Sequence, residues 1–535
     1  MIIDNKFFMN KSDLITLNEA SQWASNYMNK SVSSSNINYL LQYSIINKII
    51  NEGIIYISKS ELKKYYDKNK IEKNWKEKLG DDLNWHLSFD NLREIDTTKH
   101  VHRLHPYKGK FIPQLVDYFL NSKTDDFKKE IYFNKNDIIL DPFCGSGTTL
   151  VQANELNINA IGIDISHFNT MIANCKIENV DLEKLELILK DITAKLEKYI
   201  LSSKIFEFEN ELNDRLNIFN EINFPNIEYK KNVRDKKLNH NIYGKEKEKE
   251  FLSVYNDLIK KYKINLHNKK NDTFLYRWYI PNIIRELEFV SDLINDIKDE
   301  KIKNIVRIIL SRTMRSCRAT THSDLGTLLK PINSTYYCRK HYKICKPVFS
   351  INKWWKVYAK DSIKRLKKFN ELRTNTYQIC ITGDARNMNI FENIKNLSEN
   401  KNFYKLLKKQ KISGIFTSPP YIGLIDYHEQ HAYAYDLFKI NRNDNLEIGS
   451  LSKGQSSIAK QSYIEDIAKV LNNSKKYMKD NYNIFIVAND KYDLYPKIAE
   501  LSKMKIVNRF KRPVLNRVEK DKSAYSDTIF HLKVV

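Results

Sequence analysis

The feature that most constrains the fold is a short apolar run that ends in an acid and leads into a glycine turn. Residues 137–141 have the sequence Asp-Ile-Ile-Leu-Asp, and Pro142-Phe-Cys-Gly-Ser-Gly-Thr-Thr149 follows directly. Such a run is typical of a strand buried in a parallel sheet. Gly145 and Gly147 allow a tight turn and close approach of the backbone to a ligand, and a helix is expected from Thr148. This order predicts an α/β domain with a doubly wound sheet.

A second apolar run, Ala160-Ile-Gly-Ile-Asp164, comes next along the chain and also ends in an acid. An acid in this place can hold both ribose hydroxyls of an adenosine cofactor. A phosphate-binding loop is a poor match, because no Gly-Lys-Ser/Thr follows the glycines. The alternative is a glycine turn in an ordinary α/β domain, and the residues around the turn together with Asp164 favour a cofactor site.

A proline-rich tetrapeptide, Ser418-Pro-Pro-Tyr421, follows a third expected strand at residues 411–417. Two prolines fix the backbone and remove two amide donors, so local carbonyls remain free to accept hydrogen bonds. Bonds from an exocyclic amine to the Ser418 hydroxyl and the Pro419 carbonyl would favour a pyramidal nitrogen. Tyr421 could stack on a base taken out of a duplex. The alternative is an ordinary proline turn after a strand.

At these two motifs the chain resembles the DNA amino-methyltransferases, which make N4-methylcytosine or N6-methyladenine. The likeness covers roughly residues 100–200 and 375–535. It implies a Rossmann-like methyltransferase sheet, S-adenosyl-L-methionine as cofactor, and methyl transfer to the exocyclic amine of a flipped base in double-stranded DNA. Ser418 preceded by Thr417 resembles the cytosine-N4 branch, whereas Asp or Asn is more usual in the adenine-N6 branch. The cofactor half precedes the catalytic half, which is the reverse of many enzymes with this tetrapeptide.

The resemblance also implies the site residues. Residues 102–111 are similar to the family's leading cofactor motif, and residues 383–385 are similar to the segment that reaches the cofactor adenine. The residues expected to bind the cofactor are His102, Tyr107, Lys110, Phe111, Asp141, Pro142, Phe143, Gly145, Gly147, Thr148, Thr149, Asp164, Asp384 and Ala385. The residues expected to carry catalysis are Ser418, Pro419, Pro420 and Tyr421.

DNA contacts are expected in and beside a helical, lysine-rich insertion. Closely spaced arginines suit guanine edges or phosphates, although pairing with acids of the protein's own surface is an equal alternative. Aromatic and histidine side chains after the tetrapeptide are expected to line the base pocket. The residues expected to contact DNA are Arg312, Arg315, Arg318, Tyr427 and His428.

The amino-terminal region is expected to form a small winged helix-turn-helix domain. Helical spacing is found at residues 16–24, 33–41 and 60–66, with short strands at 45–50 and 53–57. The alternative is a helical bundle that packs on the core or forms a dimer contact. The expected domains are 1–75 (winged helix), 95–180 (cofactor half), 181–370 (helical insertion and candidate target-recognition region) and 371–535 (catalytic half). The last of these is expected to end in an antiparallel hairpin that forms one reversed edge strand.

Composition agrees with a nucleic-acid enzyme. The chain has 535 residues with 89 Lys and Arg against 65 Asp and Glu, which gives a net charge of +24. Such a charge supplies phosphate affinity without sequence information, although an AT-rich coding bias is the alternative cause. No membrane span or signal pattern is found, and six scattered cysteines suit a reducing cytosol, so a cytoplasmic protein is expected. A cognate restriction endonuclease and a homodimer are partners compatible with this class.

Two further patterns have residues that could bind a metal. Cys338, His341 and Cys345 have zinc-like spacing, with Cys317 as a conceivable fourth ligand, but buried structural thiols are the favoured interpretation and no metal is expected. His428 and His431 are three apart, whereas a metalloprotease helix needs four.

Other activities were weighed as well. C5-cytosine methylation is a poor fit, because it commonly uses a Pro-Cys nucleophile and the chain has none. An RNA guanine-N2 methyltransferase and a non-catalytic DNA-binding regulator remain as alternatives.

Overall fold

The computed structural model describes residues 13–28, 32–42, 45–51, 53–68, 79–80, 82–89, 92–269, 272–324, 327–397, 401–514 and 525–534. Among these residues, no helix is both long and apolar enough to cross a membrane. The part of the predicted 1–75 domain at residues 1–12 and 69–75 lies outside the described residues.

The amino-terminal unit is a three-stranded antiparallel sheet with three helices and a core of its own. The strands have the order β1-β3-β2, and Ile15, Ile37, Ile57 and Leu62 are among the residues buried between sheet and helices. Thr16 caps the first helix, since its hydroxyl accepts from the Glu19 N–H while the Glu19 carboxylate accepts from the Thr16 N–H. The strand before this helix was not expected from the sequence. The elements are β1 (Leu14–Thr16), α1 (Leu17–Met28), α2 (Ser34–Gln42), β2 (Ile49–Asn51), β3 (Ile54–Ser58) and α3 (Lys59–Lys68).

A seven-stranded sheet with the order β11-β12-β10-β9-β4-β5-β8 forms the centre of the catalytic body. Its neighbours from β10 to β8 are parallel, and β12 runs antiparallel to both β10 and β11. The strands are β4 (Ile138–Asp141), β5 (Asn159–Asp164), β8 (Gln378–Thr382), β9 (Ile412–Thr417), β10 (Met478–Ala488), β11 (Met504–Val514) and β12 (Tyr525–Val534). The predicted doubly wound α/β class is confirmed. The expectation of a reversed edge strand is corrected, because the reversed strand β12 lies one place in from the edge.

Side chains alternate between the two faces of this sheet, and each face has its own core. Ile139 and Phe416 pack with α6, α7 and α8 in one hydrophobic cluster, whereas Leu140 and Ile415 pack with α17, α18, α20 and α21 in another. Burial on both faces explains why these strands are continuously apolar. The helices are α6 (Pro113–Leu120), α7 (Thr148–Glu155), α8 (His167–Ile177), α17 (Ile390–Asn396), α18 (Lys401–Gln410), α20 (Ser457–Lys475) and α21 (Tyr495–Leu501).

The predicted insertion is helical, with one small hairpin. Helices α9, α14, α15 and α16 pack against one another and against α8, while α10 and α12 form a long antiparallel pair. Helices α13, α14 and α15 also contact α19 (Ala432–Phe438) of the catalytic half. The insertion elements are α9 (Leu182–Leu201), α10 (Lys204–Asn223), α11 (Asn226–Arg234), α12 (His240–Tyr262), α13 (Phe274–Trp278), α14 (Pro281–Asn295), α15 (Glu300–Ser316), β6 (Tyr336–Cys338), β7 (Lys343–Cys345) and α16 (Asn352–Asn370).

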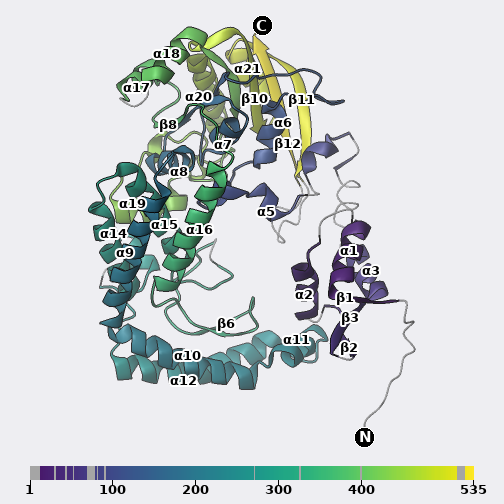
Figure 1. Cartoon of the computed structure of the whole chain (residues 1–535), viewed down its shortest axis with the longest axis vertical. Helices are drawn as coiled ribbons and strands as arrows, with labels where there is room; N and C mark the ends of the chain where they lie inside the picture. The colour runs from purple at the N-terminus through teal and green to yellow at the C-terminus, as the bar shows by residue number, and fades with distance from the viewer. Residues whose placement is uncertain are drawn as a thin grey trace.

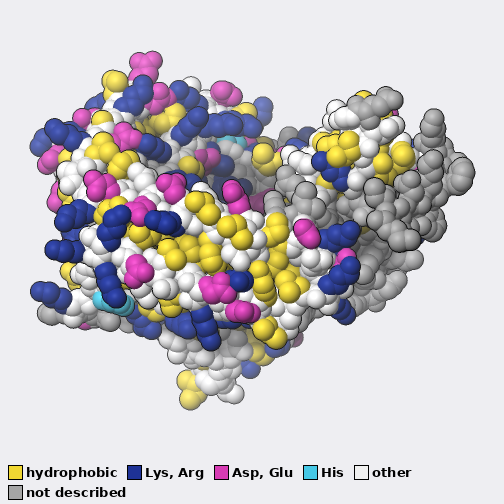
Figure 2. Space-filling view, turned by 90° about the horizontal axis from the view of Figure 1, so that it is seen from below, with side chains coloured by type: hydrophobic (Ala, Val, Ile, Leu, Met, Phe, Trp, Pro, Cys, Tyr) yellow, Lys and Arg dark blue, Asp and Glu magenta, His cyan; other side chains and the backbone are white. Residues whose placement is uncertain are grey.

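The parts are arranged as an open arch in Figure 1. The sheet lies at the top, the bundle of α9, α14, α15 and α16 descends from it, and α10–α12 runs across the bottom toward the amino-terminal unit. Seen from below, lysines and arginines are interspersed with acids and apolar side chains (Figure 2). On this face, therefore, the net positive charge is not gathered into one basic surface.

Candidate active site

A cavity that is partly open to solvent lies at the carboxyl ends of β4, β5, β8 and β9. Open parallel sheets bind ligands at this edge. Thirteen of the residues singled out from the sequence line it: Tyr107, Lys110, Phe111, Pro142, Phe143, Gly145, Thr148, Asp164, Asp384, Ala385, Ser418, Pro420 and Tyr427. The structure adds Gly109, Cys144, Ser146, Ile165, Asn169, Gly383, Leu446, Glu447 and Ile448. Both predicted motifs therefore face the same space.

The glycine turn after β4 needs its glycines for two reasons. Gly145 and Gly147 have φ values of +51° and +76°, in the left-handed region that favours glycine. A Cβ on Gly145 would lie 3.0 Å from the Tyr107 hydroxyl, and a Cβ on Gly147 would lie 2.9 Å from the Ala173 Cβ in α8. The turn is therefore fixed by backbone geometry and by packing at the same time.

Asp164 closes this turn from the end of β5. Its carboxylate accepts from the backbone N–H of Gly145 at 2.8 Å and of Ser166 at 2.8 Å, and from the Asn169 amide at 3.1 Å. Burial raises the pKa of Asp164 to about 6, against the lowering effect of these hydrogen bonds. The carboxylate lines the cavity and retains lone pairs for a ligand hydroxyl.

Asp141 has a structural position instead. Its carboxylate is buried and accepts from the Thr417 hydroxyl at 2.6 Å, which ties β4 to the end of β9, and from the Phe143 N–H at 3.2 Å. Burial raises the pKa of Asp141 to about 6. Asp141 does not line the cavity, and the same holds for His102, Gly147, Thr149, Pro419 and Tyr421.

The leading segment covers one end of the cavity. Lys110 donates to the His102 carbonyl at 2.6 Å, and this bond joins the two ends of the segment 102–110. Burial lowers the pKa of Lys110 to about 8. The Tyr107 ring lies over Gly145, and its hydroxyl accepts from the Asn169 amide at 3.4 Å. His102 is buried beneath this segment and acts through its backbone carbonyl.

Two polar atoms in the cavity wall test whether a nucleoside cofactor fits. The Ser146 hydroxyl and the Asn169 side-chain oxygen are buried and have no hydrogen-bond partner among the described residues. Both residues line the cavity beside Asp164. Buried polar atoms usually have partners, so an acceptor and a hydroxyl left open here suit a ligand with its own amine and hydroxyl groups. The residues present fit an adenosine-type cofactor.

The catalytic tetrapeptide begins at the end of β9. Ser418 and Pro420 line the cavity, and the Pro420 carbonyl accepts from the Tyr463 hydroxyl of α20 at 2.9 Å. Tyr421 turns away toward a small neighbouring pocket, where its hydroxyl donates to Asp527 of β12 at 3.1 Å. Ser418 and Pro420 thus face the cofactor cavity, Tyr421 faces its neighbour, and Pro419 lines neither of the two.

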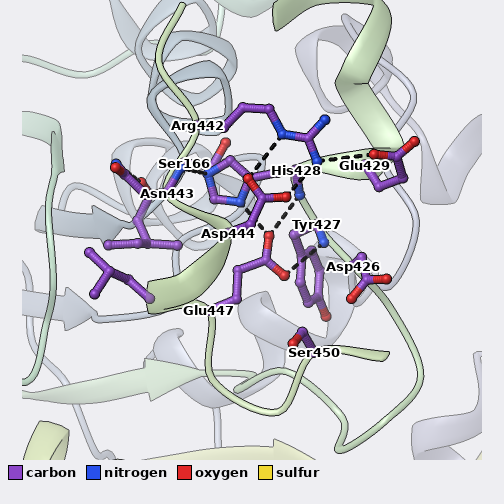
Figure 3. A network of polar contacts seen from close by, with 12 residues as sticks. Ser166, Asp426, Tyr427, His428, Glu429, Arg442, Asn443, Asp444, Glu447 and Ser450 are labelled. Carbon is purple, nitrogen blue, oxygen red and sulfur yellow. Dashed lines mark hydrogen bonds and ion pairs between the residues drawn. The ribbon is translucent and has the colours of Figure 1, made fainter. Parts of the chain in front are cut away.

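A buried network holds the chain that follows the tetrapeptide over the cavity (Figure 3). The Glu447 carboxylate accepts from the backbone N–H of Tyr427 at 3.1 Å and of His428 at 2.8 Å, and it also bonds the His428 imidazole. The other imidazole nitrogen accepts from the Asn443 N–H at 3.2 Å. Tyr427 is thereby placed against the cavity, with its ring 6.2 Å from that of Tyr107. No local sequence pattern identifies Glu447.

Several of the expected DNA contacts are corrected by burial. Arg312 is 6% exposed and its guanidinium pairs with Asp361 at 2.7 Å, so it braces α15 against α16. Arg318 is buried too, over the Tyr433 ring, and donates to the Arg315 carbonyl at 3.0 Å. His428 is fully buried in the Glu447 network. These side chains cannot reach DNA without leaving the interior.

Arg315 is the partly exposed member of the arginine group. Burial, then the charges of Arg315 and Arg318, lowers the pKa of Lys108. Lys108 follows Tyr107 and its backbone N–H donates to Gln430, so positive charge gathers beside the cavity. Cations there are suited to phosphates.

A doubly wound sheet with β12 reversed, a glycine turn under a buried acid, and a Ser-Pro-Pro-Tyr loop facing the same cavity define the class of amino-methyltransferases. Comparisons with known proteins agree. A family model described as DNA methylase matches residues 3–174. The chain is 46% identical over 527 residues to Type II methyltransferase M.MjaII of Methanocaldococcus jannaschii, covering 97% of each chain. The chain therefore belongs to the N6/N4 family of DNA amino-methyltransferases, and the predicted resemblance is confirmed.

More distant likenesses are partial. Type II methyltransferase M.MvaI of Kocuria varians is 32% identical over 111 residues, which is 21% of this chain and 22% of that one. The rRNA methyltransferase aviRa from Streptomyces viridochromogenes overlaps 83% of this chain and 94% of its own, with a TM-score of 0.29 and 10% identity. That structural likeness is too weak to add to the argument.

Proposed function

We propose that this enzyme transfers a methyl group from S-adenosyl-L-methionine to N4 of a cytosine flipped out of double-stranded DNA. The observation that carries the proposal is the placement of Ser418 and Asp164 in the wall of one cavity. One residue comes from the catalytic tetrapeptide and the other from the strand end expected to hold a ribose. The cofactor, when bound, supplies an electrophilic methyl group.

The residues that would hold the cofactor are those of the glycine turn and its lid. Asp164 would accept hydrogen bonds from the ribose hydroxyls. The Ser146 hydroxyl and the Asn169 side-chain oxygen would form hydrogen bonds with polar groups of the same ligand. Asp384 and Ala385 would border the adenine, and Tyr107 with Phe111 would cover the opposite end. His102 and Asp141 would support this site without touching the ligand.

The residues that would act on the base are those of the tetrapeptide. The Ser418 hydroxyl and the Pro419 carbonyl would accept hydrogen bonds from the exocyclic amine, which orients its lone pair toward the cavity. Tyr421 would stack on the flipped base. In the structure its hydroxyl is bonded to Asp527, so stacking would either keep this bond or break it. Positioning and exclusion of water would supply most of the rate.

The choice of cytosine rests on Thr417-Ser418. A serine in the first position resembles the cytosine-N4 branch, and Thr417 is committed to the Asp141 bond, so Ser418 is the hydroxyl left to face the base. Adenine N6 is the second candidate, since the same two acceptors suit either exocyclic amine.

We infer further that the enzyme methylates a fixed DNA sequence and works beside a restriction endonuclease. The relatives carry the name Type II methyltransferase. The order β1-α1-α2-β2-β3-α3 of the amino-terminal unit would suit a winged helix-turn-helix domain, whose second helix would enter the major groove. Arg315 and Lys108 would contact phosphates beside the flipped base.

The test is modified-base mapping of DNA from cells that express the wild type or Ser418→Ala. N4-methylcytosine in one fixed motif, absent with the variant, is the expected result. N6-methyladenine in a fixed motif would show that the target base is adenine and not cytosine. Absence of both marks with the wild type, while the purified protein binds the cofactor, would contradict the proposal.

A further inference from the structure

Four soft ligand side chains meet at the small β6–β7 hairpin of the insertion, far in sequence from the catalytic motifs. Cys338 ends β6, His341 lies in the turn, and Cys345 ends β7. The fourth is His322, from the segment that follows α15. One ligand atom from each lies within 4.8 Å of the other three. Within the hairpin, the His341 Nδ1 is 3.6 Å from the Cys338 sulfur and 3.5 Å from the Cys345 sulfur, and the His322 Nδ1 is 3.7 Å from the Cys338 sulfur.

These separations match a tetrahedral zinc site. With Zn–S near 2.3 Å and Zn–N near 2.0–2.1 Å, tetrahedral geometry separates a sulfur from a nitrogen by about 3.5 Å. The three sulfur–nitrogen distances in the cluster lie within a few tenths of an ångström of that value. Two cysteines and two histidines make a complete ligand set for a structural zinc ion.

The surroundings suit a closed, structural site. Cys338 and Cys345 are 2% and 7% exposed, and His322 and His341 are half-buried. The Tyr336 hydroxyl shares a hydrogen bond of 2.7 Å with His322 Nδ1 and accepts from the His322 backbone N–H at 3.2 Å, so it holds the ring beside the thiols. Metal binding would replace the first of these bonds and leave the second.

The two faces of the hairpin pack differently: Tyr337 and Ile344 lie in the main hydrophobic core, whereas the face that carries the two thiols has a small core of its own. Its separate hydrophobic cluster consists of Tyr336, Cys338 and Cys345 with Ile332 packed against them. Its outer anchors are the Asn220 side chain, which bonds Ile344 in both directions, and Glu248, which accepts from the Tyr337 N–H. A metal bound on this face would add to the few apolar contacts there. The sequence-based suggestion of Cys317 as fourth ligand is corrected, because Cys317 is buried in the main core.

We propose that His322, Cys338, His341 and Cys345 bind one zinc ion, which fastens the segment after α15 to the β6–β7 hairpin. The ion would link two stretches of the insertion at the point where the chain returns from the α10–α12 pair toward α16. It has no part in the methyl transfer. The proposal is independent of which base is methylated.

The test is metal analysis of the purified full-length protein, with cobalt substitution. About one zinc per chain is expected, and the cobalt form should show a thiolate-to-cobalt charge-transfer band with intense tetrahedral d–d bands. Cys338→Ser and His322→Asn should each lose most of the metal. Two controls should keep it: Cys317→Ala, and His240→Gln, which changes a neighbouring histidine 3.3 Å from the Tyr337 hydroxyl.

A measurement on the wild type covers the case in which the ligand variants do not fold. Titration with a mercurial reagent should release one zinc as two thiols react. Protein purified from zinc-supplemented cells with less than a tenth of an equivalent of metal would overturn the proposal. So would variants that retain full zinc content, or a Cys338–Cys345 disulfide found by non-reducing peptide mapping.

Discussion

The cofactor turn (residues 141–149) and the catalytic loop (residues 418–450) both contribute to the wall of one cavity, but they are held in different ways. The turn is fixed by its own backbone, by two glycines with positive φ, and by Asp164 at the end of the adjacent strand. The loop is held by side-chain contacts, namely those of its own Glu447 with the backbone of Tyr427 and His428, and that of Tyr463 from α20 with Pro420.

This difference separates two kinds of sensitivity. Changes in the turn should act directly on cofactor affinity, because steric fit is local there. Changes in the loop should act on the placement of the base and on stability, because one buried carboxylate supports several backbone and side-chain groups. Four predictions test that separation.

The largest effect is expected from Ser418→Ala. Loss of the hydroxyl removes one of two acceptors that orient the amine, so kcat should fall by about 100-fold or more. Cofactor affinity should stay within about twofold, because the turn is untouched. Single-turnover methylation and isothermal titration would measure the two quantities. A matching loss of cofactor affinity would break the proposed division between turn and loop.

Glu447→Ala should give the next largest effect. It leaves the His428 imidazole and two buried backbone N–H groups without their acceptor, so the free energy of unfolding should fall by about 3 kcal/mol. Denaturant unfolding would measure this change. Glu429→Ala is the control, since this exposed acid pairs with Arg442 at the surface of the same network. Equal losses of unfolding free energy in the two variants would show that burial of the Glu447 carboxylate does not determine its contribution to stability.

Gly145→Ala should weaken cofactor binding and have little effect on other properties of the enzyme. Its Cβ would lie against the Tyr107 hydroxyl, and an L residue with φ near +51° costs about 1–2 kcal/mol. Cofactor affinity should fall by about tenfold or more. The double variant Gly145→Ala/Tyr107→Phe should recover part of it by removing the nearest atom. No recovery would assign the loss to backbone strain alone.

The smallest effect is a pH dependence of cofactor binding. Burial raises the pKa of Asp164 to about 6, so the carboxyl takes up a proton below that pH, and the charged form is the better acceptor for ribose hydroxyls. The dissociation constant should therefore rise as pH falls through 6, with a slope of at most about tenfold per unit. Asp141, whose pKa is also raised to about 6, remains in Asp164→Asn, which should bind weakly with a flat profile. A sloping profile in that variant would assign the effect to Asp141.

The sequence predicted the turn well because its information is local. The apolar runs at 137–141 and 160–164 form neighbouring strands of one sheet, and Gly145 and Asp164 line the cavity at their ends, whereas Asp141 and Gly147 lie outside its lining. The arginines of α15 show where this approach ends. Arg312 and Arg315 are alike in sequence, yet only the fold brings Asp361 against Arg312. Glu447 and His322 were not predicted either. The partner of Glu447, His428, is 19 residues away, and His322 lies outside the local pattern formed by Cys338, His341 and Cys345.

One pairing in the sheet also sets the order of events during synthesis. Thr417 bonds Asp141 across 276 residues of chain, and β9 lies directly beside β4 in the sheet. At about 5–20 residues per second, a ribosome needs on the order of 15–55 s to deliver that partner strand. Throughout this interval the nascent β4–β5 pair waits with an unpaired edge and an uncovered apolar face. A chain that ends before β9 would lack the Thr417–Asp141 bond, the catalytic tetrapeptide and the helices α20 and α21 that cover the second face of the sheet.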